Sequence, residues 1–168
     1  CTEIVLQVRD YRRIGSELRD GKLRNIHTYS YFDADGCFRI TPNVVGWIRP
    51  YHGNEPVLVS VNSHGIRGPE LREGRARRIA FVGDSITFGG VPEQDTFVRL
   101  VETKLGSDPD LSDEPWECLN MGTTDAGVVE YHRKVRHHAL ELNPEVIVVC
   151  FYLNDSRPPQ GFLGEAGR

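Results

Sequence analysis

The sequence has no long apolar run: no stretch approaches the ~20 apolar residues that a membrane-spanning helix needs. It also has no surplus of positive charge, because 20 Lys and Arg stand against 24 Asp and Glu, a formal net charge of -4. Proteins that bind nucleic acid ordinarily carry a basic surface, so we expect no nucleic-acid partner. Neither G-x-G-x-x-G nor G-K-[ST] follows the first strong apolar segment, which argues against a nucleotide-binding sheet.

Paired cysteines are absent as well. Cys1, Cys37, Cys118 and Cys150 form no C-x-x-C pair and show no zinc-type spacing with histidine, so neither a metal nor a cofactor is expected. Cys118 and Cys150 fall in apolar segments and are interpreted as small buried hydrophobic residues rather than a disulfide. Localisation therefore stays open between a bacterial cell envelope and the cytoplasm. At Cys1 an arbitrary boundary is favoured over a lipid-modified cysteine, and an anchor upstream stays open.

The chain of 168 residues divides into two parts of different character. Residues 31–75 are rich in Gly, Pro, Asn and aromatic residues, with an apolar strand pattern at residues 57–61, and we interpret residues 1–75 as a β-rich and loop-rich N-terminal appendage. The charged stretch before residue 78 is a suitable linker. Residues 76–168 form an α/β domain.

Strand and helix patterns alternate regularly in this second part. The predicted elements are a strand at 79–82, a helix at 92–105, a strand at 116–120, a helix at 128–142 and a strand at 146–151. The first helix is expected to begin with Pro92 in its first turn and to bury Phe97, Leu100, Val101 and Leu105. Such alternation predicts parallel strands joined by right-handed crossovers, in a layered α/β sheet.

Three strand ends in this part carry residues suited to acyl transfer. Gly83-Asp84-Ser85 follows the first strand, Asn120-Met121-Gly122 closes the second, and Asn154-Asp155 follows the third. Ligands of parallel α/β sheets bind at the carboxyl ends of the strands. A hydroxyl nucleophile, a glycine N–H open to close approach and an amide donor are expected to meet there. Each segment taken singly is equally consistent with a turn, the start of a helix or a helix cap.

On these three segments the chain resembles the SGNH/GDSL hydrolase superfamily of lipases and esterases. Gly83-Asp84-Ser85-Ile86-Thr87 matches the nucleophile block, Asn120-Met121-Gly122 the second block and Asn154-Asp155 the third. The segment Asn62 to Glu70 is similar to one that precedes the nucleophile strand in some bacterial members. The resemblance implies a three-layer α/β/α parallel sheet of the flavodoxin-like SGNH type.

The resemblance also implies an esterase or deacetylase mechanism. Ser85 would attack an ester carbonyl, while its own N–H, the Gly122 N–H and the Asn154 side chain hold the oxyanion. The substrate would be a small-molecule, carbohydrate or lipid ester, and Asp84 would shape the loop. An O-acyltransferase that uses the same serine on a carbohydrate is an alternative. So is a non-catalytic ligand-binding module that has lost the acid–base pair.

The sequence departs from the family at two points. Tyr152 stands where the family's third block has a glycine, two residues before the asparagine. No Asp-x-x-His block follows Asn154, although the family takes its catalytic histidine from one. The histidines after Ser85, which are His132, His137 and His138, fall on a predicted helix and are interpreted as solvated or packing residues. His64, in a predicted turn, is retained as a weaker candidate for the base.

These departures predict a domain that is incomplete at its C-terminus. The remaining strand and the Asp-x-x-His block would then lie on polypeptide beyond Arg168 or on a separate chain. An apolar strand at residues 146–151 left at the edge of a sheet is an aggregation hazard. We therefore expect a further segment or a second chain to cover it, and slow or absent turnover by residues 1–168 alone.

Overall fold

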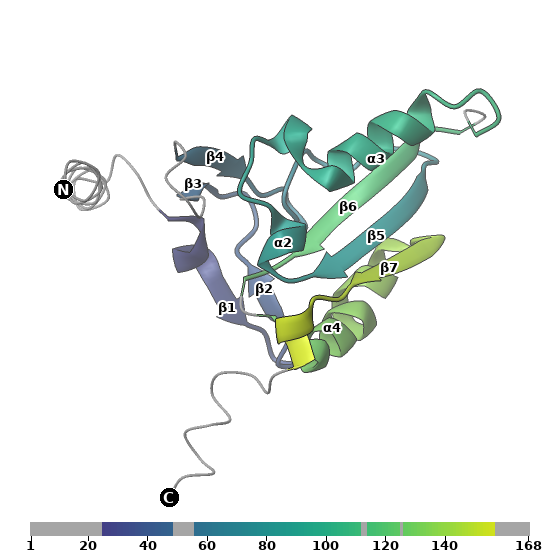
Figure 1. The fold of residues 1–168 in the computed structure, drawn as a ribbon. Helices are drawn as coiled ribbons and strands as arrows, with labels where there is room; N and C mark the ends of the chain where they lie inside the picture. The colour runs from purple at the N-terminus through teal and green to yellow at the C-terminus, as the bar shows by residue number, and fades with distance from the viewer. Residues whose placement is uncertain (1–24, 49–55, 112–113, 125, 157–168) are drawn as a thin grey trace, which may run out of the picture.

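A parallel three-stranded sheet forms the centre of the protein in a computed structural model, which describes residues 25–48, 56–111, 114–124 and 126–156 (Figure 1). The central strand is β5 (Arg77–Gly83), with β6 (Trp116–Gly122) on one side and β7 (Val146–Cys150) on the other. All pairings in this sheet are parallel. The architecture is mixed α/β, and the three strands match those predicted from the sequence.

The strand register brings the three carboxyl ends to one level. Gly83, the last residue of β5, pairs with Gly122 of β6 and with Cys150 of β7. Every residue of β6 is buried, as is β5 from Ile79 onward. Short helical turns follow two of these ends: α2 (Ser85–Phe88) after β5 and η5 (Leu153–Ser156) after β7. The loops that leave β5 and β7 therefore begin side by side.

Helices pack on both faces of this sheet. One face carries α3 (Phe97–Gly106), whose Val98 joins a core cluster with Ile79 and Phe81 of β5. The other face carries a continuous helical stretch made of α4 (Val128–Lys134), the π-helical η3 (Val135–Ala139) and the 3-10 turn η4 (Leu140–Leu142). This stretch confirms the helix predicted at 128–142. It ends at Asn143, which adopts a left-handed conformation with φ of 50°.

The prediction for the first helix was wrong at its start and at Phe97 and Leu100, which are exposed, whereas Val101 and Leu105 pack against the core as predicted. Residues Glu93–Asp95 form a separate 3-10 turn, η2, and α3 begins at Phe97. The reason is Thr96, whose hydroxyl accepts the Arg99 N–H at 3.3 Å and so caps the helix. From that start, Val98 points to the sheet, and Leu100, two residues further round the helix, is 56% exposed.

The described part of the N-terminal region consists of a short turn and two antiparallel hairpins. The turn η1 (Ile26–Tyr29) leads into β1 (Ser30–Phe32), which pairs with β2 (Phe38–Ile40). The second hairpin pairs β3 (Val45–Ile48) with β4 (Val57–Ser60), the strand predicted at 57–61. Its core cluster includes Phe88 of α2, so the hairpins and the loop that carries Ser85 share one hydrophobic core.

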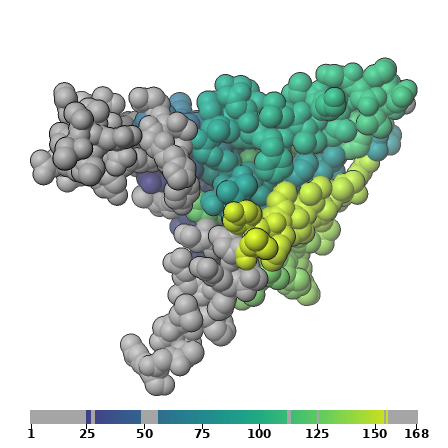
Figure 2. Space-filling model, in the orientation of Figure 1, coloured from purple at the N-terminus to yellow at the C-terminus, as the bar shows by residue number. Residues whose placement is uncertain are grey.

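The two edges of the central sheet differ. Beside β6, the backbone of Arg67 pairs with that of Asn120 as an isolated antiparallel β-bridge, and the Cys118 backbone forms hydrogen bonds with side chains of α3. Among the described residues, β5 is the only strand paired with β7, and Val149 of β7 is 50% exposed. Figure 2 shows β7 and η5, in yellow and yellow-green, lying uncovered on the surface. None of the described helices is long and apolar enough to cross a membrane.

Candidate active site

Ser85 is the first residue of α2 and lies just beyond the end of the central strand. Its side chain is half-buried. Asp84 caps the helix, because its carboxylate accepts the Ile86 N–H at 2.8 Å. This contact is the loop-shaping role expected for Asp84. The turn thus holds the serine at the carboxyl end of β5, between the ends of β6 and β7.

Two glycines allow α2 to pack closely against these strand ends. A Cβ atom on Gly83 would lie 2.0 Å from Thr87 Oγ1, and one on Gly122 would lie 2.1 Å from the backbone nitrogen of Phe88. Neither separation is compatible with a side chain. The Gly122 N–H donates to Asn120 Oδ1 at 3.2 Å. An oxyanion would have to draw this N–H away from Asn120, so the oxyanion role of Gly122 stays a prediction beside its steric one.

The third strand end carries a closed turn. Asn154 lies within η5, and its side chain is outside the described part of the structure. The Asp155 N–H donates to the Tyr152 carbonyl at 3.0 Å, and the Tyr152 N–H donates back to the Asp155 carboxylate at 2.5 Å. The Tyr152 side chain is exposed. These reciprocal bonds fix the backbone on both sides of Asn154, as a capping box does.

A buried acidic cluster underlies this turn, and sequence reasoning missed it. The Tyr131 hydroxyl on α4 donates to Asp155 Oδ2 at 2.7 Å, and both residues are only 3% exposed. Burial, reinforced by the Asp155 carboxylate, raises the pKa of Tyr131 and keeps the hydroxyl protonated. Burial also raises the pKa of Asp84, and the nearby Asp155 charge adds to this effect. Two carboxylates therefore flank the serine loop.

Among the described side chains, no histidine forms a hydrogen bond with Ser85. The His64 side chain is exposed, and its carbonyl accepts a hydrogen bond from the His138 ring at 2.8 Å. His138 is buried, and burial lowers its pKa to about 4. His137 lies 3.6 Å from Asp35, while His132 is exposed. The helix histidines thus are packing or surface residues, and a role for His64 as base stays a prediction.

One buried amine lies behind the strand ends. The Lys134 side chain on α4 donates to Thr123 Oγ1 at 3.2 Å, and the Thr123 N–H donates to the Gly83 carbonyl at 3.0 Å. Burial lowers the pKa of Lys134 to about 8. The sequence did not indicate this contact, because Lys134 falls in a predicted helix whose face there is partly apolar. Thr123 is itself buried, so the pair joins α4 to the end of β6.

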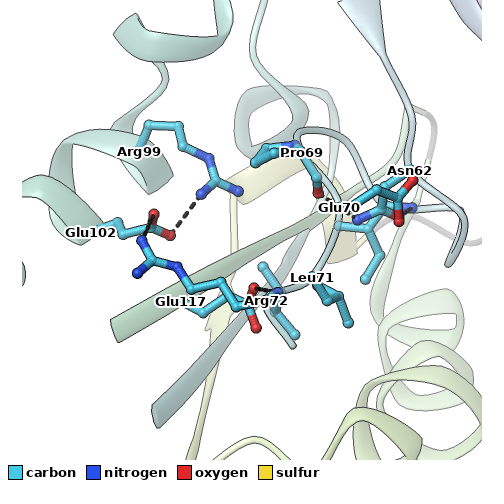
Figure 3. A pocket seen from close by; sticks show the side chains of 10 residues that line it. Asn62, Pro69, Glu70, Leu71, Arg72, Arg99, Glu102 and Glu117 are labelled. Carbon is cyan, nitrogen blue, oxygen red and sulfur yellow. Dashed lines mark hydrogen bonds and ion pairs between the residues drawn. The ribbon is translucent and has the colours of Figure 1, made fainter. Parts of the chain in front are cut away.

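A cavity lies away from Ser85, beside the edge of β6. It has a volume of about 260 Å³ and lies between the segment 62–72 and α3. Figure 3 shows Arg72, Arg99 and Glu102 gathered on one side of it, with Asn62 and Glu70 on the other. Arg99 bonds to Glu102 at 2.6 Å, so these charges are already paired. The cavity lies within the segments that cover this sheet edge, and none of the predicted site residues lines it.

The described residues contain no group of three or more His, Cys, Asp or Glu side chains arranged to hold a metal ion. Comparison of the sequence with models of known protein families found no match, and a search of curated proteins found no relative either. Function is therefore inferred from the residues at the strand ends.

Proposed function

We propose that the protein is a serine hydrolase of the SGNH/GDSL type that cleaves ester-linked acyl groups. One observation carries the proposal: Ser85 lies at the first turn after the central parallel strand, where the ends of β6 and β7 flank it. Ligands of parallel sheets bind at this edge. The helices on both faces of the sheet support the three-layer, flavodoxin-like arrangement that this family implies.

In the proposed reaction, Ser85 Oγ bonds to the ester carbonyl carbon while its proton passes to a general base. The tetrahedral oxyanion is held by the N–H groups of Ser85 and Gly122 and by the Asn154 side chain. Collapse breaks the ester C–O bond, and the base returns the proton to the departing alcohol. Water then releases the acid from the acyl-serine by the same steps. Each oxyanion donor contributes roughly 3–4 kcal/mol to lowering the barrier.

The proposal requires a base that the described residues do not supply. A serine hydroxyl without one is a weak nucleophile. We therefore place the histidine and its aspartate on polypeptide other than the described residues, in a segment or second chain that reaches the open side of the sheet. β7 leaves room for such polypeptide, because it pairs with β5 alone among the described strands.

Hydrolysis of a short-chain aryl ester tests the proposal. The full natural protein, together with any partner chain that carries the base, should be assayed alongside Ser85→Ala. We expect Ser85→Ala to lower kcat by at least about 10³-fold, as loss of a nucleophile does. Ser107→Ala is the matched control, since Ser107 bonds only to the end of α3 and should keep full activity. Equal turnover by the parent protein and Ser85→Ala would remove the nucleophile from the proposal.

A non-catalytic binding module is the second candidate, and it is favoured by the absence of an imidazole at Ser85 among the described residues. This function predicts saturable binding of an acylated glycan without turnover in the complete protein. Calorimetric binding together with the ester assay separates the two: binding without any Ser85-dependent turnover supports the module, and Ser85-dependent turnover supports the hydrolase.

A further inference from the structure

Asp155 is the residue in which two parts of the candidate site meet. Its carboxylate accepts the Tyr131 hydroxyl from α4 at 2.7 Å and the Tyr152 N–H at 2.5 Å. Asp155 belongs to η5, the turn that also contains Asn154. The acid therefore connects the helix on one face of the sheet to the turn at the end of β7.

Hydrophobic packing gives the turn little support. β7 is the edge strand of the described sheet, and Tyr152 and Leu153 are exposed, so no hydrophobic packing of these two side chains fixes η5. Asp155, by contrast, is buried. A buried carboxylate needs hydrogen-bond donors, and among the described side chains the Tyr131 hydroxyl is the one that donates to it. The turn thus depends on the Tyr131 bond for its connection to α4.

Electrostatic repulsion makes this dependence stronger. Asp84, the cap of α2, is also buried, and the charges of Asp84 and Asp155 oppose each other. The hydrogen bond from the Ile86 N–H offsets part of the free-energy cost of burying the Asp84 carboxylate, as the Tyr131 hydroxyl does for Asp155. Without that hydroxyl, Asp155 would face a like charge with only one donor. We expect it to turn away and to carry η5 with it.

We propose that Tyr131 is a positioning residue of the active site: its hydrogen bond to Asp155 holds η5 so that Asn154 is presented beside the Ser85 loop. The inference rests on the proposed hydrolase function, in which Asn154 donates to the oxyanion. Such a donor acts mainly in the transition state. Loss of the Tyr131 hydroxyl should therefore lower kcat and leave KM nearly unchanged.

The test compares Tyr131→Phe with the parent protein in the ester assay, using the complete natural polypeptide. We expect kcat to fall about tenfold or more, because a small misplacement of a donor has this effect, while KM stays within about twofold. Asp155→Asn should have a similar effect. The double variant should be no slower than the slower single variant, since both changes break one contact. Tyr31→Phe, which alters a half-exposed tyrosine of β1, is the control and should keep the parent kcat.

The decisive comparison repeats Tyr131→Phe in a protein that also carries Asn154→Ala. If Tyr131 acts through Asn154, Tyr131→Phe should lower kcat no further once Asn154 is alanine. An equal loss in both backgrounds would show a general structural role and overturn the inference. If Ser85→Ala abolishes turnover and Tyr131→Phe keeps the full kcat, the inference fails alone. If turnover does not depend on Ser85, the proposed function fails and the inference with it.

Discussion

The two edge strands of the central sheet, β6 and β7, differ in whether side chains bond to their outer backbone groups. At β6 the Cys118 N–H donates to Glu102 at 2.6 Å, and the Cys118 carbonyl accepts from Arg99 at 2.9 Å. At β7 the described residues offer no such partner, and Val146 and Val149 are about half exposed. Charged side chains are a common protection against edge-to-edge association. The comparison shows that the described residues protect the β6 edge and give the β7 edge no such protection.

Arg67 is central to the covered edge, and its loss should have the largest effect. Its guanidinium is fully buried and donates to the carbonyls of Phe88 and Val91, each at 2.5 Å, and to Glu93 at 2.9 Å. We expect Arg67→Met to lower the free energy of unfolding by about 3–5 kcal/mol, because it leaves buried acceptors unpaired. Urea denaturation measures this change.

Arg75→Met is the matched control for Arg67. Arg75 is exposed and its ion pair with Glu114, at 3.1 Å, should contribute less than about 1 kcal/mol. If the two variants lose the same stability, the buried arginine is not what holds the covered edge.

His138 should make this edge sensitive to acid. Its ring donates to the His64 carbonyl and so supports the segment that covers β6, while its Nδ1 has no partner among the described residues. The folded pKa of about 4 lies below the ordinary value of 6.5, so the unfolded chain binds the proton more tightly. Stability should therefore fall as the pH drops from about 6.5 to about 4, by up to roughly 3 kcal/mol.

Urea denaturation of the parent and His138→Gln between pH 7 and pH 4 measures the histidine contribution. The variant should lack the part of the pH dependence that lies in this window. The same slope in both proteins would assign the acid sensitivity to other groups.

A substitution at Gly122 tests how closely the end of β6 packs against the serine loop. An added methyl would lie 2.1 Å from the Phe88 nitrogen, so Gly122→Ala should displace α2. We expect a loss of about 1–3 kcal/mol in unfolding free energy, together with loss of Ser85-dependent turnover. Gly106→Ala is the control, because nothing lies within 4 Å of a Cβ there. Equal stability of Gly122→Ala and the parent would contradict the close packing.

A charge placed on the β7 edge should have the smallest effect on the free energy of unfolding and the largest effect on self-association. Val149→Lys places a charge on β7, where the side chain is half exposed, and should change the free energy of unfolding by less than about 1 kcal/mol. We expect less light scattering from concentrated solutions of residues 1–168. Val45→Lys adds the same charge on an exposed position of β3 and should reduce scattering less. Equal reduction by both would mean that net charge, not the edge, controls association.

Much of the fold could be predicted because the strands are continuous apolar runs bounded by glycine and proline. The start of α3 could not, since the cap at Thr96 competes with a proline that favours an earlier start. The positions of Ser85 and Gly122 at strand ends followed from the same pattern. The buried roles of Arg67 and Tyr131 did not. They depend on partners such as Asp155, far along the chain, and residue type alone favours an exposed arginine.

The most direct test of the central claim is to map where a fluorophosphonate attaches. Such a probe forms a bond with an activated serine oxygen and loses fluoride, so peptide mass spectrometry identifies the residue. In the complete natural protein, we expect a single adduct on the peptide that contains Ser85, absent after Ser85→Ala. An adduct on another residue, or none on Ser85 while the ester is still hydrolysed, would contradict it.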